Sequence, residues 1–146
     1  MREYLFRGKR LDNGEWVSGG SIFKLINKSG DHFFIPQLGE KLIATHDDNM
    51  MNIVALENMT MYRVDPETVG QYTGLRDCKR TKEYPEGQMI FEGDVVVSTN
   101  ANRLSNKPYI VEFSAISGYW CCDPKREPVV IGNIHDNPEL LKEGGE

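Results

Sequence analysis

The sequence lacks several features that would disclose a function directly. No apolar run approaches the roughly 20 residues of a membrane-spanning helix, so we expect no membrane association. Segment 1–10 has no apolar core, so we expect no secretory signal. No G-x-S-x-G motif occurs, which removes the usual signature of a serine nucleophile. A long stretch with 3.6-residue apolar periodicity is also missing, which argues against a helical protein.

Cysteine is scarce as well. Cys78, Cys121 and Cys122 are odd in number and include an adjacent pair, which excludes a regular disulfide framework. No C-x-x-C spacing is present to indicate a zinc site. Because successive side chains of a strand alternate, one of Cys121 and Cys122 is expected to be buried and the other exposed. Free thiols favour a reducing compartment, and we predict a cytoplasmic protein.

Positive charge is in deficit. The chain has 17 Lys and Arg against 22 Asp and Glu, which gives a formal net charge of −5. Non-specific nucleic-acid binding depends on many cations at phosphates, so this balance disfavours it. A local basic surface beside exposed Tyr109, Tyr119 and Trp120 is the alternative. The candidate residues of that surface are Arg76, Lys79, Arg80, Lys82, Arg103 and Lys107.

Turn-forming residues, by contrast, are abundant. Fourteen glycines and seven prolines, together with Asn and Asp, punctuate the chain. They separate short runs rich in β-branched and aromatic residues, which predicts a mainly β fold of short antiparallel strands. Asn13-Gly14 lies between the strand-like segments 5–11 and 16–26. This dipeptide predicts a hairpin with a type I′ turn, because Asn and Gly tolerate positive φ.

The region between residues 31 and 64 has weaker patterns. Segments 31–36 and 41–45 carry apolar residues typical of a pair of strands. The polar segment 46–52 predicts an exposed loop. Segment 53–64 permits a strand, with Ile53, Ala55, Met59 and Met61 on one face, and segment 50–56, which contains Ala, Leu, Met and Glu, permits a short helix instead. Segment 59–64 favours a strand.

The second half of the chain suggests a small meander. Asp65-Pro66 marks a boundary, because a residue before proline avoids the helical region. We therefore expect one domain, 1–146, with an N-terminal β sub-region, 1–64, and a C-terminal small-barrel sub-region, 65–146. From Gly93 onward, short strands alternate with turns in an order that commonly closes into a barrel-like, SH3-like structure.

Two local features of this half can be predicted in detail. Tyr109, Val111 and Phe113 alternate with polar residues, so we expect them on one face of a single strand. At the end of the chain, Asn137 can cap a short helical turn and Pro138 suits its first position. We expect this C-terminal helical turn to be the one confident helix.

Candidate catalytic groups are few. Asp94 precedes a run of valines, and we expect its carboxylate to accept backbone N–H groups of its own turn. The alternative is a hydrolase in which Asp94, His135 and Asp136 converge, with His135 as a base. His32 and the segment 46–48 form the His-carboxylate cluster of the sequence, but adjacent loop carboxylates are usually solvated. We predict no catalytic residue, no metal site and no cofactor.

Four blocks of sequence follow one another from near the first residue to near the last. They are Phe6–Lys9 with Asn13–Val17, then Asp65–Leu75, Ile90–Val96 and Val130–Leu141. In these blocks the chain resembles the YopX family of phage and prophage proteins. The resemblance implies a mostly β protein carried by phages of Gram-positive bacteria, with no established biochemical activity, and it supplies no catalytic residue.

These observations favour a non-enzymatic, β-rich interaction module in the host cytoplasm. Strand edges that do not close tend to pair with another chain, so we expect a homo-oligomer. A host or phage protein is a further expected partner. The alternatives are a small-barrel nucleic-acid-binding protein and the hydrolase described above.

Overall fold

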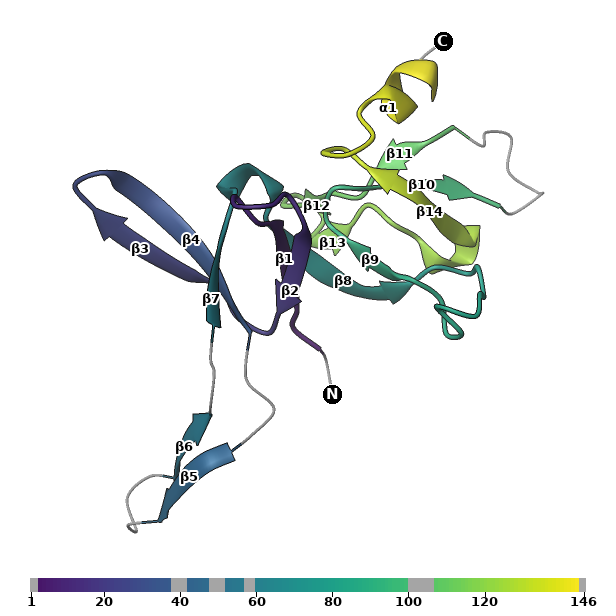
Figure 1. Ribbon diagram of the computed structural model, residues 1–146. Helices are drawn as coiled ribbons and strands as arrows, with labels where there is room; N and C mark the ends of the chain where they lie inside the picture. The colour runs from purple at the N-terminus through teal and green to yellow at the C-terminus, as the bar shows by residue number, and fades with distance from the viewer. Residues whose placement is uncertain (1–2, 38–41, 48–51, 57–59, 100–106, 145–146) are drawn as a thin grey trace. The chain divides into compact units, whose positions relative to one another are not determined.

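A computed structural model describes residues 3–37, 42–47, 52–56, 60–99 and 107–144 (Figure 1). The chain is mainly β, its strand pairs are antiparallel, and one short helix lies near the C-terminus, which confirms the predicted fold class. The chain divides into two compact units. We call Leu5–Val69 the N-terminal unit, and Met1–Tyr4 with Gly70–Glu146 the C-terminal unit. Within the described residues, no helix is both long enough and apolar enough to cross a membrane.

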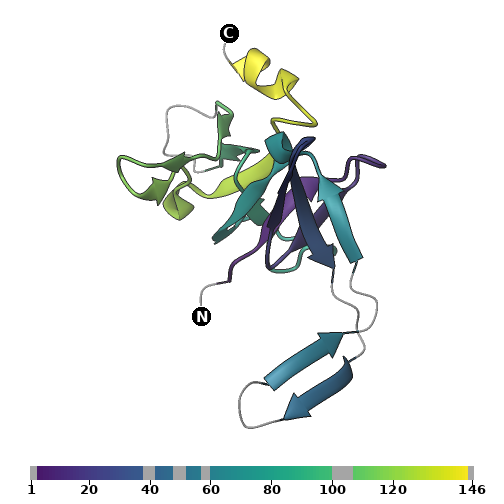
Figure 2. The same ribbon diagram turned by 90° about the vertical axis from the view of Figure 1, so that its left-hand side faces the viewer.

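The N-terminal unit is built from hairpins. Its elements are β1 (Phe6–Lys9), β2 (Trp16–Gly19), β3 (Phe23–Asn27), β4 (Gly30–Gln37), β5 (Leu42–Asp47), β6 (Asn52–Leu56), β7 (Thr60–Val64) and the 3-10 helix η1 (Pro66–Thr68). β1 pairs with β2, and β4 lies between β3 and β7. β5 pairs with β6, as the two antiparallel arrows in Figure 2 show. Ile35 and Val64 are fully buried. Gly8 lets β1 approach Val64, since an added Cβ would lie 2.9 Å from the Val64 Cβ.

The first hairpin forms as expected, but its turn is different. Gly14 has a φ of 72°, whereas among the described non-glycine residues only Glu127 has a positive φ. A type I′ turn would need positive φ at Asn13 too, so that prediction is wrong. Instead, the Gly14 N–H donates to the Arg10 carbonyl (2.9 Å) and the Arg10 N–H donates to the Glu15 carbonyl (2.9 Å). These bonds close a longer loop over residues 11–14.

Two other expectations for this unit are wrong. β4 pairs with β3 and β7, whereas β5 pairs with β6, so 31–36 and 41–45 are not partners. The predicted loop 46–52 loses residues at both ends to strands, and of the strand and the short helix that the sequence permits after it, the structure shows the strand over 52–56. Helix propensity is a weak preference, and pairing with a neighbouring strand overrides it. Residues 48–51 lie outside the described part of the chain.

The C-terminal unit is an open arrangement of short sheets. Its elements are β8 (Gly70–Arg76), β9 (Met89–Phe91), β10 (Asp94–Ser98), β11 (Tyr109–Ile110), β12 (Phe113–Ser114), β13 (Tyr119–Trp120), η2 (Pro124–Arg126), β14 (Pro128–Asn133) and α1 (Glu139–Gly144). β8 pairs with β9, β10 lies between β11 and β14, and β12 pairs with β13. The described strands do not close into a barrel. The succession of short strands after Gly93 was predicted correctly, whereas the predicted closure into a barrel is not found.

The core of the C-terminal unit is small. Ile90, Val96, Val111 and Cys122 form it, with half-buried Leu75, Tyr109, Trp120 and Val130 packed against it. Cys122 is buried and Cys121 is exposed, which confirms the predicted alternation, and all three cysteines are free.

The expected single strand over 109–113 is broken. Val111 is fully buried, whereas Phe113 is 51% exposed, so the two side chains do not share one face. The Val111 carbonyl accepts a hydrogen bond from the Gly93 N–H (2.9 Å), and the Val111 N–H donates one to the Asp94 carbonyl (2.8 Å). These bonds tie Val111 to the turn before β10. The chain after it is then directed into a separate hairpin with β13.

Candidate functional site

The most exposed apolar strand of the described chain is β3. All five of its residues are exposed, and Phe23, Leu25 and Ile26 are among them. β3 is the outer strand of the β3-β4-β7 sheet, so the edge that does not face β4 is open (Figure 1). An edge of this kind presents unpaired backbone N–H and C=O groups to any chain that can add a strand.

The positive charge of Lys24 on β3 is paired within the same hairpin. The Lys24 ammonium lies 2.9 Å from the Asp31 carboxylate on β4, and both groups are about half-exposed. Lys24 also lies over the ring of Phe33 at 5.7 Å. A lysine on an edge strand usually discourages pairing. Here its charge is met by a neighbour on the same hairpin, so that protection is weakened.

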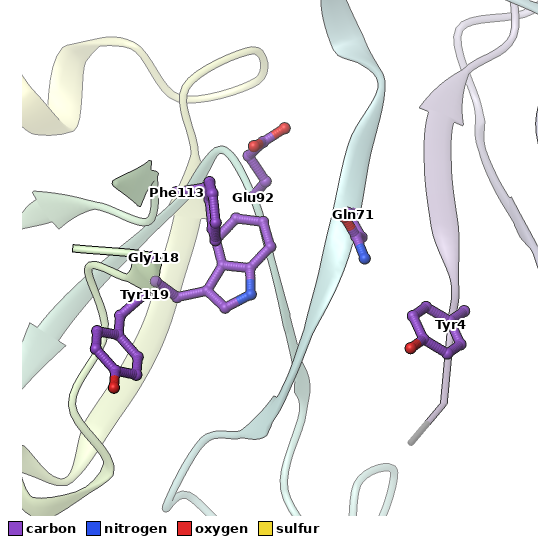
Figure 3. A pocket seen from close by; sticks show the side chains of 7 residues that line it. Tyr4, Gln71, Glu92, Phe113, Gly118 and Tyr119 are labelled. Carbon is purple, nitrogen blue, oxygen red and sulfur yellow. The ribbon is translucent and has the colours of Figure 1, made fainter. Parts of the chain in front are cut away.

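The second candidate is a hollow in the C-terminal unit. Its volume is about 600 Å³, within the roughly 300–1,000 Å³ of small-ligand pockets. It is lined by Tyr4, Gln71, Glu92, Phe113, Gly118, Tyr119 and Trp120, which come from separate segments of this unit (Figure 3). Phe113 and Trp120 face each other across β12 and β13, with ring centroids 5.3 Å apart and planes at 70°. Phe113 and Tyr119 are more than half exposed.

The acidic side chain among the lining residues of this hollow is Glu92. Burial raises the pKa of the Glu92 carboxyl, and repulsion from the Glu112 carboxylate raises it further. Both causes disfavour the charged form, and each would be relieved by a cation placed beside Glu92.

A smaller hollow of about 420 Å³ shares Trp120 with the first one. It is lined by Tyr109, Trp120, Cys121, Cys122, Asp123 and Arg126. Burial and the nearby Cys122 thiol raise the pKa of Tyr109 to about 12. Burial likewise raises the pKa of Cys122. A buried thiol with a raised pKa is a poor nucleophile, so Cys122 is not a reactive cysteine.

The predicted basic surface is described in part. Arg76, Lys79, Arg80 and Lys82 are exposed on or beside the segment between β8 and β9, and Lys107 is exposed as well. The Arg76 guanidinium donates to the Gly87 carbonyl (3.0 Å), and that of Arg80 donates to the Pro85 carbonyl (3.5 Å). These two arginines thus help to hold their own loop. Arg103 lies outside the described residues.

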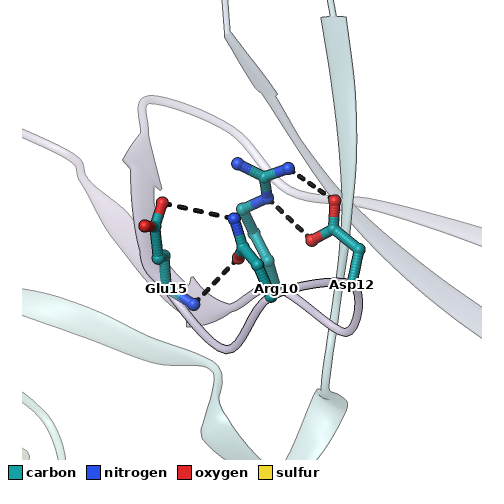
Figure 4. A network of polar contacts seen from close by, with 4 residues as sticks. Arg10, Asp12 and Glu15 are labelled. Carbon is teal, nitrogen blue, oxygen red and sulfur yellow. Dashed lines mark hydrogen bonds and ion pairs between the residues drawn. The ribbon is translucent and has the colours of Figure 1, made fainter.

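The basic residues near the N-terminus are held by aromatic and acidic neighbours. The guanidinium of Arg7 lies 4.6 Å from the ring of Trp16, and the Lys9 ammonium lies 5.8 Å from it. Arg10 bonds the Asp12 carboxylate through Nε at 2.9 Å (Figure 4) and lies 4.2 Å from the Tyr62 ring. This pairing raises the pKa of Arg10 and lowers that of Asp12.

The alternative catalytic group is placed unfavourably for chemistry. Asp94 is 2% exposed, and its Oδ2 accepts from the Phe91 N–H at 2.8 Å, which confirms the predicted turn role. Asp136 accepts from the Asn133 side-chain amide at the surface (3.1 Å). A substrate has no access to the Asp94 carboxylate. In the described part of the chain, no three His, Cys, Asp or Glu side chains are grouped to hold a metal, and the side chains of 46–48 lie outside it.

Comparison with known proteins decides the family. The model of the family described as "YopX protein" matches residues 5–142, nearly the whole chain. The chain belongs to the YopX family. Among solved structures, this YopX chain is similar to the crystal structure of protein EF1440 from Enterococcus faecalis. The two share 20% identity over 94% of this chain and 97% of that one, with a TM-score of 0.52, which shows a shared fold. No curated protein matches the sequence significantly.

Sequence patterns alone did not locate either candidate site of this YopX chain. β3 carries Phe23, Leu25 and Ile26, apolar residues that suit a buried strand, and only the structure shows that all five of its residues are exposed. The hollow joins residues as distant as Tyr4 and Trp120. One local signal was available for it, namely Phe113 and Trp120 on either side of the turn at Gly118, a spacing that makes the two rings cross-strand partners.

Proposed function

We propose that this YopX protein is a non-enzymatic interaction module of the host cytoplasm that self-associates through the open edge of β3. The observation that carries the proposal is the exposure of all five β3 residues beside an unpaired strand edge. Strand addition satisfies the backbone groups of such an edge and covers its apolar side chains together.

A second copy of the chain suits this edge. In an antiparallel pair centred on Leu25, Phe23 of one copy faces Asn27 of the other, and Lys24 faces Ile26. The two lysines therefore do not oppose each other, and the two Leu25 side chains meet on the axis. Leu25 is 54% exposed. Covering that fraction is worth about 1 kcal/mol per copy, from the roughly 1.5–3 kcal/mol of a whole aliphatic side chain.

Light scattering coupled to size exclusion tests the pairing. We expect twice the 16.6 kDa chain mass for the unaltered protein at about 100 µM. Leu25→Lys and Leu25→Glu each place like charges opposite one another on the axis, so each variant alone is expected to be monomeric. A mixture of the two is expected to recover the dimer, because the opposed charges then attract.

The control is Ile116→Lys, which changes a fully exposed isoleucine of the C-terminal unit and leaves the dimer intact. A monomer for the unaltered chain would refute self-association. Dimers of both Leu25 variants would refute its placement on β3.

Nucleic-acid binding is the alternative that the exposed cations support. Lys79 and Lys82 are exposed and can contact phosphates. Binding through them predicts a gel shift at low salt that is lost in Lys79→Glu/Lys82→Glu. The net charge of −5 opposes this alternative, and no shift with single- or double-stranded probes at micromolar protein would exclude it.

A further inference from the structure

We propose that the hollow lined by Phe113, Trp120 and Glu92 binds an arginine side chain of a protein partner. The proposal concerns the C-terminal unit alone and does not depend on β3. It rests on three properties of the hollow: its aromatic rings, its carboxylate Glu92 and its polar side chain Gln71.

The aromatic faces suit a planar cation. Phe113 and Trp120 are in edge-to-face contact, with ring centroids 5.3 Å apart, so each ring holds the other in place and a planar cation would stack on a ring face that this contact leaves open. Phe113 is 51% exposed and Tyr119 is 75% exposed, which leaves their rings available. Guanidinium groups are weakly hydrated and stack on aromatic rings, most strongly on tryptophan. An apolar ligand alone would not use the acidic side of this hollow.

Charge complementarity selects a cation over a neutral or anionic ligand. Glu92 lines the hollow and is only partly exposed, and the Glu112 carboxylate repels it. A guanidinium donates two parallel hydrogen bonds to one carboxylate, a geometry that a lysine ammonium does not offer. The side-chain carbonyl of Gln71 is an acceptor for a further N–H of the same group. The five donors of arginine therefore match this lining better than the three of lysine.

The test uses the full chain and the peptide acetyl-Gly-Arg-Gly-amide at low salt. Its match is the citrulline peptide, which has the same shape but no charge. We expect the arginine peptide to move the indole N–H signal of Trp120, and not that of Trp16, in a saturable way in proton–nitrogen NMR spectra. The citrulline peptide is expected to bind about tenfold more weakly, because the charge-assisted hydrogen bonds are lost.

Two variants locate the binding. Glu92→Gln is expected to weaken binding about tenfold, and Phe113→Leu about threefold by removing a ring without removing apolar contact. Glu83→Gln, the same change at an exposed loop carboxylate, is the control and leaves binding unchanged. Equal affinity for the citrulline peptide would overturn the proposal. The absence of any Trp120 shift at about 20 mM peptide, or equal weakening by Glu83→Gln, would overturn it as well.

Discussion

Asp77 provides the most direct test of how the C-terminal unit is held together. The residue lies at the start of a polar connection, yet it is 4% exposed. Its Oδ1 accepts from the Gln88 N–H (2.9 Å) and its Oδ2 accepts from the Val130 N–H (3.2 Å). Its own N–H donates to the Gln88 carbonyl (2.9 Å). One carboxylate thus ties the loop between β8 and β9 to β14.

The structure sets the size of the effect of removing this carboxylate. A hydrogen bond to a charged group contributes about 1.5–3 kcal/mol, so Asp77→Ala is expected to lower the free energy of unfolding by about 3–6 kcal/mol. Asp77→Asn keeps one acceptor and sets a donor against the other N–H, so a loss of about 2–3 kcal/mol is expected. A protein of this size has a free energy of unfolding of about 5–15 kcal/mol, so Asp77→Asn, which loses less of it, is the variant expected to remain folded for the measurement.

Urea unfolding followed by tryptophan fluorescence measures the loss as a lower midpoint at unchanged slope. The control is Asp123→Ala, because the Asp123 carboxylate accepts one N–H, from Lys125, at the surface end of η2. That variant is expected to lose about 1 kcal/mol. Amide exchange at Gln88 and Val130 is expected to accelerate in Asp77→Asn. If Asp77→Ala costs no more than Asp123→Ala, or if exchange at these two amides is unchanged, Asp77 does not tie the loop to β14.

Three further predictions concern the same unit. Ile90→Ala is expected to cost about 2–5 kcal/mol in urea unfolding, whereas Ile116→Ala, at a fully exposed site, stays within about 0.5 kcal/mol; equal effects would contradict the assigned core. Gly87→Ala and Gly74→Ala both place alanine at positive φ, which costs about 1–2 kcal/mol of the free energy of unfolding. Only at Gly87 would the new Cβ also clash with the Asp77 carbonyl, so the loss of stability in Gly87→Ala is expected to exceed about 3 kcal/mol. The pKa of Tyr109 is about 12 in the folded protein, above the ordinary tyrosine pKa of about 10, so the folded state holds this proton more tightly. Stability present below pH 10 is therefore lost as pH rises toward 12, and unfolding midpoints measured across this range should fall less steeply in Tyr109→Phe.

Local patterns predicted the strands well, because they depend on neighbouring residues. The valine run from Val95 to Val97 lies in β10, and Cys121 and Cys122 divide between surface and core. The carboxylate of Asp94 was placed correctly because its partner, the Phe91 N–H, is three residues away. Predictions failed where a distant partner decides the conformation. Thus 31–36 pairs with β3 and β7 rather than with 41–45, which pairs with β6.

The prediction that the C-terminal strands close into a barrel failed for the same reason. Closure depends on which strands pair at the ends of a sheet, and a two-residue break at Val111 is enough to divert the chain. The break results from backbone bonds to Gly93 and Asp94, which no side-chain pattern records. The hollow was equally hidden, since it needs Tyr4 beside residues from β8 and β13. Of the predicted basic surface, the residues that the structure describes are exposed, namely Arg76, Lys79, Arg80, Lys82 and Lys107.

The placement of carboxylates favours binding over catalysis as the next property to test. Asp77 and Asp94, the two buried aspartates among the residues whose side chains are described, each accept backbone N–H groups, so their charge is satisfied by the fold. A catalytic carboxylate would have to be free to exchange a proton with a substrate. Glu92 differs from both, because burial and Glu112 act on it unfavourably and it lines an open hollow beside aromatic rings. Glu92 is therefore the carboxylate lining this hollow that a cationic partner would stabilise.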